Sequence, residues 1–114
     1  MIMKKIIAGK QYNTKTATAL VSMTNGRIYD DFAYYEATIY RTKKGQLFLY
    51  ECGGARSKMA VSVGNNGTSG SSDICLLDDS VAVELVQVWH TDNYIDHDET
   101  NYALENLGVK IQEG

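Results

Sequence analysis

The acidic segment near the C-terminal end holds residue types that can bind a divalent metal. Two histidines and four carboxylates lie within ten positions: His90, Asp92, Asp96, His97, Asp98 and Glu99. Imidazole nitrogens and carboxylate oxygens are common ligands of zinc and calcium. Their spacing matches neither the HExxH pattern of a zinc protease nor the ordered acidic pattern of a calcium loop. We therefore expect a solvated acidic connection without a metal, whose carboxylates favour the protonated form of both histidines.

The two cysteines and a glycine-rich run are the other candidates for chemistry. Cys52 and Cys75 fit no metal-ligand spacing, and nothing in the sequence pairs Cys52 with a histidine as a nucleophile requires. Residues 64–72, GNNGTSGSS, lack the Gly-Lys-Ser/Thr ending of a phosphate-binding loop. We expect reduced thiols, a mobile connector over 64–72, no catalytic residue and no cofactor. The protein is therefore predicted not to be an enzyme.

A group of cations flanking a hydrophobic run can contact the phosphates of a nucleic acid: Arg41, Lys43, Lys44, Arg56 and Lys58. Because the chain reverses after residue 51, the first three are expected at one end of a sheet and the last two near the other. This predicts a track across the sheet rather than one patch. Tyr40 and Tyr50 are expected to be exposed beside the cations and to stack on bases. The alternative is that the lysines only protect exposed turns and edges from aggregation.

The net charge of −3 is divided unevenly along the chain. Residues 1–58 hold ten of the eleven basic residues and four acids (+6), whereas residues 59–114 hold one lysine and ten acids (−9). Such asymmetry indicates a basic binding face, an acidic one, or two halves that neutralise each other. The carboxylates of residues 92–99 could also occupy a basic nucleic-acid channel by imitating its charge.

The length of 114 residues is that of one compact domain, residues 1–114. Hydrophobic residues make up 44% and charged residues 22%, which is typical of a globular protein. No run approaches the ~20 apolar residues of a membrane helix, and the N-terminal lysines precede too short an apolar run for a signal peptide. We expect a cytoplasmic protein without membrane contact.

Hydrophobic alternation predicts the hairpin that positions the central cations. Its strands are residues 37–41 and 46–51, and the turn Thr42-Lys43-Lys44-Gly45 has glycine where a positive φ is needed. Aliphatic side chains fall on one face and aromatic ones on the other: Ile39, Leu47 and Leu49 against Tyr40, Phe48 and Tyr50.

The segment before this hairpin is predicted as two short strands within 3–12 and a helix over 14–24. The helix rests on Ala17, Leu20, Val21 and Thr24 at helical spacing, ended by Asn25-Gly26. Residues 27–35 are expected to connect that helix to the hairpin.

The segment after the hairpin is predicted to add a third strand to the meander at 59–63. A strand follows at 73–77, and Asp78 then caps a helix over 79–90, although its valines leave a strand possible. A short helix within 92–106, ended by Gly108, precedes an edge strand at 109–111. The expected class is α+β: an antiparallel β-meander of three to five strands flanked by two or three helices.

Three blocks of the sequence resemble a family of small proteins from Gram-positive bacteria. Residues 4–17, KKIIAGKQYNTKTA, resemble the family's opening KKIINGKxYDTxTA, and residues 40–58 resemble its YRTKKGxxFLYxxGGxxSK. The run 64–74 is similar to the family's loop of Gly, Asn and Ser. The blocks share the family's order and spacing.

The resemblance implies a protein of phages, plasmids or other mobile elements, acting in the cytoplasm of a bacterial host. Some relatives are associated with inhibition of type II CRISPR–Cas systems. It therefore implies a non-enzymatic anti-CRISPR-like inhibitor whose partner is Cas9 or its guide RNA. Residues 78–85 are more apolar than the family's acidic helix, which indicates a partner-facing surface or a homodimer. The alternative is a general nucleic-acid-binding or regulatory accessory protein of a phage or plasmid.

Overall fold

The computed structural model describes residues 3–27, 31–64 and 67–112. In chain order its elements are β1 (Lys4–Ile7), β2 (Lys10–Asn13), β3 (Thr18–Thr24), β4 (Tyr35–Arg41), β5 (Leu47–Gly53), β6 (Val61–Val63), β7 (Gly67–Ser69), β8 (Ser71–Leu77), α1 (Asp79–Thr91) and α2 (His97–Asn106). Every strand pair is antiparallel and both helices follow the last strand. The predicted α+β class is confirmed.

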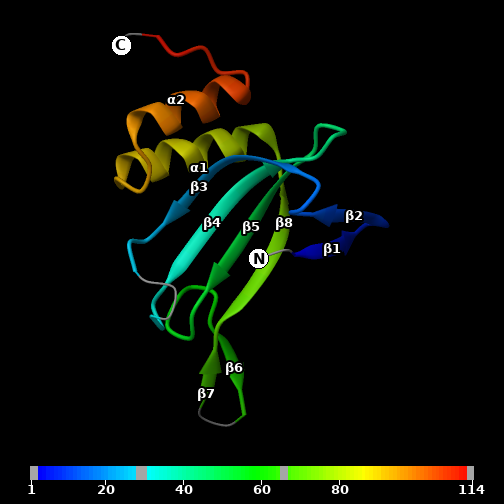
Figure 1. Cartoon of the computed structure of the whole chain (residues 1–114), viewed down its shortest axis with the longest axis vertical. Coiled ribbons are helices and arrows are strands. Elements are labelled where there is room, and N and C mark those ends of the chain that lie inside the picture. Colours follow the sequence, from blue (N-terminus) through cyan, green and yellow to red (C-terminus); the bar gives the residue numbers. More distant parts are fainter. Residues whose placement is uncertain (1–2, 28–30, 65–66, 113–114) are drawn as a thin grey trace.

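The central sheet has four strands in the order β3-β4-β5-β8 (Figure 1). In the β4–β5 hairpin Ile39 lies opposite Leu49, and the turn is closed by the Thr42 N–H, which donates to Gln46 O at 2.9 Å. Gly45 has a φ of +95°, in the region that glycine tolerates best. The predicted hairpin is confirmed, and each strand is two residues longer at the end away from the turn.

The two faces of the sheet bury different kinds of side chain. One face forms an aliphatic core with the helices, in which Ile39 and Leu47 pack with Val86 and Ala103. The opposite face buries a mainly aromatic cluster: Tyr12, Phe48, Tyr50, Cys52 and Ile74. The predicted division of the hairpin into an aliphatic and an aromatic face is confirmed. Because both faces are covered, β5 is apolar on both sides.

Helix α1 begins immediately after β8, as Asp78 predicted. Asp78 has the extended conformation of an N-cap residue, with φ −87° and ψ 163°, although its side chain makes no capping hydrogen bond. The helix buries Ala82, Val86 and Trp89 against the sheet. Burial of that one stripe, with spacings of four and three residues, outweighs the intrinsic preference of valine for strands.

Helix α2 begins at a capping box. The Asp96 carboxylate accepts from the Glu99 N–H, and the Glu99 side chain accepts from the Asp96 N–H. Gly108, at φ +84°, follows the helix end as predicted. The strand expected at 109–111 is absent: these described residues have no regular structure. Neither helix among the described residues is long and apolar enough to cross a membrane.

The helix predicted over residues 14–24 is wrong, because Thr18–Thr24 forms strand β3. A bulge between Ala19 and Val21 buries the consecutive residues Leu20 and Val21. The bulge breaks the period of two, so the apolar positions imitate a helical stripe. β-branched threonines and the partner strand β4 decide the outcome in favour of a strand.

The connection predicted over residues 27–35 joins two strands and packs against the segment after β5. Residues 28–30 lie outside the described residues. The Arg56 N–H donates to Phe32 O and the Gly54 N–H donates to Tyr34 O. A Cβ at Gly54 would lie 2.5 Å from Phe32 O, so glycine permits this close approach.

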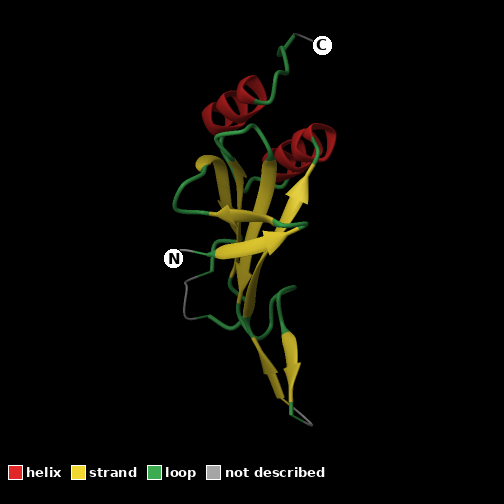
Figure 2. Ribbon diagram, turned by 90° about the vertical axis from the view of Figure 1, so that its right-hand side faces the viewer, coloured by secondary structure: helices red, strands yellow, loops and turns green. Residues whose placement is uncertain are grey.

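The third strand predicted for the meander belongs to a separate hairpin. Strand β6 pairs with β7 and not with the central sheet. The connector expected over 64–72 therefore holds β7 and the first residues of β8; residues 65–66 lie outside the described residues. Figure 2 shows this β6–β7 hairpin, the arm, projecting from the body of the molecule. Alternation defines the faces of a strand but not its neighbour.

Candidate nucleic-acid interface

The β4–β5 turn places Lys43 and Lys44 in solvent. Both side chains are exposed, because the turn extends beyond the last paired residues, Arg41 and Leu47. Arg41, predicted as a binding residue beside them, is half-buried, and its Nη1 donates to Asn106 O at the end of α2 at 2.9 Å. A cation at a helix C-terminus is favourable. Arg41 therefore ties the helix layer to the sheet at this end.

The β1–β2 hairpin is held close to the same end of the sheet. The Met3 N–H donates to Thr14 Oγ1 at 2.9 Å, which closes the base of the hairpin. The Tyr12 ring packs edge-on against Phe48 of β5, with centroids 5.8 Å apart. Ala8 and Gly9, with φ of +52° and +80°, form the tight turn that precedes Lys10. These contacts carry Lys10 toward the β4–β5 turn.

Strand β2 and the β4–β5 turn border an open hollow of about 620 Å³, which we call the lysine hollow. Its lining comes from one segment around β2 and one around the β4–β5 turn: Lys10, Gln11, Tyr12, Asn13, Thr16, Thr42, Lys43, Lys44, Gly45 and Gln46. Three of these residues are cations and none is an acid. The lining thus combines positive charge with amide and hydroxyl groups, which suits an anionic ligand.

The three lysines of the hollow are not neutralised by carboxylates of the protein among the described residues. Within the described part of the chain, none of them takes part in an ion pair. The first 29 residues of the sequence contain five basic residues and no acid, so the β1–β2 side contributes no carboxylate to the hollow. Lysines gathered in a concave site with low-dielectric walls concentrate a positive potential.

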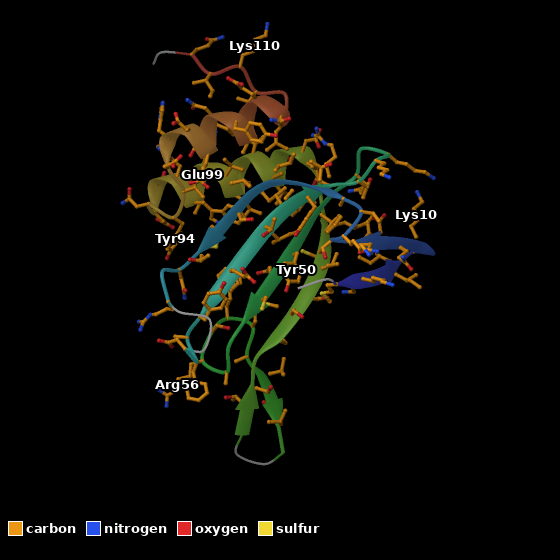
Figure 3. All side chains as sticks on the ribbon, in the orientation of Figure 1. Lys10, Tyr50, Arg56, Tyr94, Glu99 and Lys110 are labelled. Carbon is orange, nitrogen blue, oxygen red and sulfur yellow. The ribbon has the colours of Figure 1, made fainter. Side chains whose placement is uncertain are left out.

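The other two predicted cations lie at the opposite end of the sheet. Figure 3 shows Arg56 far from Lys10, on the other side of the central strands. Lys58 Nζ lies 3.0 Å from Glu51 Oε2 and 4.8 Å from the centroid of the Tyr35 ring. The expected separation into two groups is therefore what the structure has. Lys58 forms an ion pair with Glu51 while its side chain stays 65% exposed.

The two predicted stacking tyrosines differ in accessibility. The expectation that Tyr50 is exposed is wrong: it is 4% exposed and belongs to the aromatic cluster under the β1–β2 hairpin. Tyr40 is partly buried and stacks on Phe48, with centroids 5.1 Å apart and planes 13° apart. Burial, with a smaller effect of Glu36, raises the pKa of Tyr40. The aromatic face of the hairpin is thus covered by the protein's own residues.

The acidic segment 92–99 is mostly exposed, and two of its carboxylates cap helix α2. Asp96 and Glu99 cap α2, whereas Asp92 follows α1 and Asp98 lies in the first turn of α2. The rings of His90 and His97 lie 6.2 Å apart. No group of three or more His, Cys, Asp or Glu residues suited to a metal occurs among the described residues.

The two cysteines are free thiols in different environments. Cys52 is buried on the aromatic face, and Cys75 is exposed on β8. Partial burial and then the charge of Glu51 raise the pKa of the Cys75 thiol. A raised pKa disfavours the reactive thiolate at neutral pH.

Sequence reasoning missed the β2 side of the lysine hollow. Lys10, Gln11 and Asn13 lie in the block of the family resemblance, but no local signal brings them to residues 42–46. The only hint was the acid-free run of lysines at the N-terminus. Their position depends on Tyr12 packing against Phe48, a contact between residues 36 positions apart.

The chain matches no family model, no curated protein and no solved structure. What the fold and site define is a class: an α+β protein with a four-stranded antiparallel sheet, helices on one face and a lysine-lined hollow between β2 and the β4–β5 turn. Membership of the mobile-element family remains a prediction from the sequence.

Proposed function

We propose that this protein is a non-enzymatic anti-CRISPR-like inhibitor encoded by a mobile element, and that it binds nucleic-acid phosphates through the lysine hollow. The target is the guide RNA of a type II Cas9, or Cas9 itself. The observation that carries the proposal is a hollow of about 620 Å³ lined by three lysines and no acid. Inhibition by binding requires affinity at one surface and no catalytic group, so a positively charged hollow supports this proposal.

Phosphate contact predicts a specific dependence on salt. Each lysine that neutralises a phosphate releases condensed counterions, and the affinity falls as salt rises. With three lysines on a single strand, the slope of log K against log salt is expected to be about −2. Competition for an RNA that Cas9 needs would then weaken at high ionic strength.

The charge reversal Lys43→Glu with Lys44→Glu tests the proposal. It is expected to abolish binding to guide RNA in a fluorescence anisotropy titration and to remove inhibition of Cas9 cleavage in vitro. Arg27→Glu with Lys110→Glu makes the same change of net charge, from −3 to −7, at exposed sites away from the hollow. Equal losses in the two double variants would mean that net charge, not the hollow, controls binding.

A second route to the same function uses the helix layer. Residues 78–109 contain eight carboxylates and no lysine or arginine, so this layer could enter a basic channel of Cas9 as a charge mimic. Capture of Cas9 from cells that persists after ribonuclease treatment would favour this route. Failure to bind Cas9 or guide RNA at micromolar concentration, with cleavage unaffected, would contradict both routes.

The alternative function is a general nucleic-acid-binding accessory of a phage or plasmid. The same hollow supports it, because phosphate contacts carry no sequence information. Comparable affinity for guide RNA and for an unrelated RNA or DNA of equal length would favour this alternative.

A further inference from the structure

The lysine hollow has more room than a phosphate group needs. Its volume of about 620 Å³ falls within the range of roughly 300–1,000 Å³ for pockets that enclose a whole small molecule. Lys10 lies at the start of β2 on one side of the hollow, and Lys43 and Lys44 lie in the β4–β5 turn on the other. A sugar and a base could therefore enter together with the phosphate that the lysines attract.

The lining between the lysines is chemically suited to the edge of a base. The amides of Gln11, Asn13 and Gln46 carry both a donor and an acceptor, as base edges do. Gln46 Nε2 donates to Leu47 O at 2.9 Å and to Leu77 O at 3.2 Å, which fixes the plane of its amide. Asn13 Oδ1 accepts from the Lys15 N–H at 2.9 Å, which orients the second amide.

Gln11 is the one amide of the three whose side chain forms no hydrogen bond within the described part of the chain. That side chain is exposed. Lys10 and Gln11 both line the hollow, so a nucleotide whose phosphate contacts the lysine lies in the same hollow as this amide. Gln11 is thus the residue whose role can be tested without disturbing the fold.

Stacking contributes little to recognition in this hollow. Tyr12 is the aromatic residue of the lining, but it is 6% exposed and packs edge-on against Phe48. Proteins that bind single strands without base preference commonly rely on aromatic platforms. A hollow with amides instead of an open ring selects bases by hydrogen bonds.

We propose that the lysine hollow takes one unpaired nucleotide of a single strand, with Lys10, Lys43 and Lys44 on its phosphates and Gln11 on its base. This inference rests on the proposed function, because it assumes that nucleic acid is the ligand. In a duplex the Watson–Crick edges are paired, and a nucleotide cannot enter a hollow between β2 and the β4–β5 turn without being extruded from the stack. The site therefore prefers single strands and discriminates among bases.

Three probes separate the contributions of charge, strandedness and base. They are single-stranded RNA 12-mers of each base, a blunt RNA duplex of the same length, and inorganic polyphosphate as a backbone without bases. We expect the tightest homopolymer to bind at least about tenfold more strongly than the duplex. Gln11→Ala is expected to weaken that binding about fivefold, the effect of one hydrogen bond, and to leave polyphosphate affinity unchanged. Gln87→Ala, at an exposed position of α1, is the matched control.

The outcomes distinguish this inference from the proposed function. Equal affinity for duplex and single strand, or a Gln11→Ala variant that behaves as the unsubstituted protein, overturns the inference. If Lys43→Glu with Lys44→Glu still abolishes binding in that case, the proposed function stands. Absence of binding to all three probes at micromolar concentration overturns both this inference and phosphate binding by the hollow, whereas the charge-mimic route is decided by the capture of Cas9. Circular dichroism of each variant confirms that loss of binding is not loss of fold.

Discussion

At the residue scale, Glu51 shows how a cation predicted to bind a ligand can instead form a contact within the protein. Its side chain is 17% exposed and lies on the helix-covered face of β5. The Tyr35 hydroxyl and Lys58 Nζ both donate to Glu51 Oε2. A largely buried carboxylate is stabilised by such partners, because desolvation penalises its charge. The cation that the sequence assigned to a phosphate is used to neutralise a carboxylate of the protein.

Tyr35 should make stability depend on alkaline pH. Burial, and next the hydrogen bond and charge of Glu51, raise the pKa of Tyr35 far above its usual range. As pH rises, the unfolded chain therefore releases the Tyr35 hydroxyl proton before the folded chain does. The contribution of Tyr35 to the free energy of unfolding is complete below about pH 10 and is lost as pH rises beyond it. Relative to Tyr35→Phe, the unsubstituted protein should lose stability as pH rises above about 10. The loss should stay below the limit of about 1.4 kcal/mol per pH unit, because Tyr35 is only half-buried and solvent screens the effect.

Urea unfolding of both proteins between about pH 8 and 11.5 measures this difference across the pKa of an unperturbed tyrosine. Tyr102→Phe, at a tyrosine that is 55% exposed, serves as the control. A difference between Tyr35→Phe and the unsubstituted protein that stays constant with pH would contradict the assignment.

At the element scale, the β1–β2 hairpin both forms one wall of the lysine hollow and protects the edge of β8. Lys5 Nζ lies 2.7 Å from Asp73 Oδ1 and donates to Ile74 O at 3.1 Å. Asp73 Oδ1 in turn accepts from the Ile74 N–H at 2.8 Å. The ion pair therefore occupies both main-chain groups of a residue in an edge strand. The hydrogen bond that Lys5 donates to Asp73 also lowers the pKa of the Asp73 carboxyl group.

Removal of Lys5 is expected to promote self-association. An edge strand with unpaired main-chain groups is a template for another strand, and Lys5→Ala would expose the Ile74 carbonyl. We expect sedimentation velocity of Lys5→Ala to show more association with rising concentration than the unsubstituted protein. Lys4→Ala removes a neighbouring exposed lysine that has no such contact among the described residues. Equal behaviour of the two variants would mean that the edge is protected by other means.

At the scale of the whole molecule, the basic, acidic and uncharged parts of the chain lie in different places. The lysine hollow lies at one side, the acidic helices cover one face, and the arm extends along the long axis of a molecule of 52 × 35 × 20 Å. Residues 59–72, which include the arm, contain no charged residue. Val61 and Val63 are 46% and 49% exposed. The arm therefore adds little to the core that holds the hollow in place.

Stability measurements can separate the arm from the core. Ile39 is fully buried in the sheet, and Ile39→Ala should lower the free energy of unfolding by about 2–5 kcal/mol. The double variant Val61→Ala with Val63→Ala should change it by no more than about 0.5 kcal/mol, as for most surface sites. Urea unfolding measures both. A large loss in the double variant would show that the arm folds cooperatively with the sheet.

Local elements with short, consistent signals could be predicted from the residues alone. Alternation from 37 to 51 and Gly45 in the turn predicted the central hairpin, and Asp78 predicted the start of α1. The same local reasoning failed at residues 18–24, where a bulge changed the period. It also failed at 59–63, whose partner strand lies within a run that looks like a loop. The hydrophobic pattern of a short stretch indicates which of its side chains are buried. It does not indicate which other element packs against them.

The candidate site, in contrast, depends on contacts between distant parts of the chain. Lys43 and Lys44 were evident as cations, but the hollow exists because Tyr12 packs on Phe48 and brings Lys10 and Gln11 across from another hairpin. The same packing buries Tyr50, which the sequence offered as a stacking surface. The physical reason is that burial of an apolar face is non-directional. An apolar face of a sheet must be buried, but its pattern does not specify which element packs on it. The element that packs there determines which charged side chains come close together.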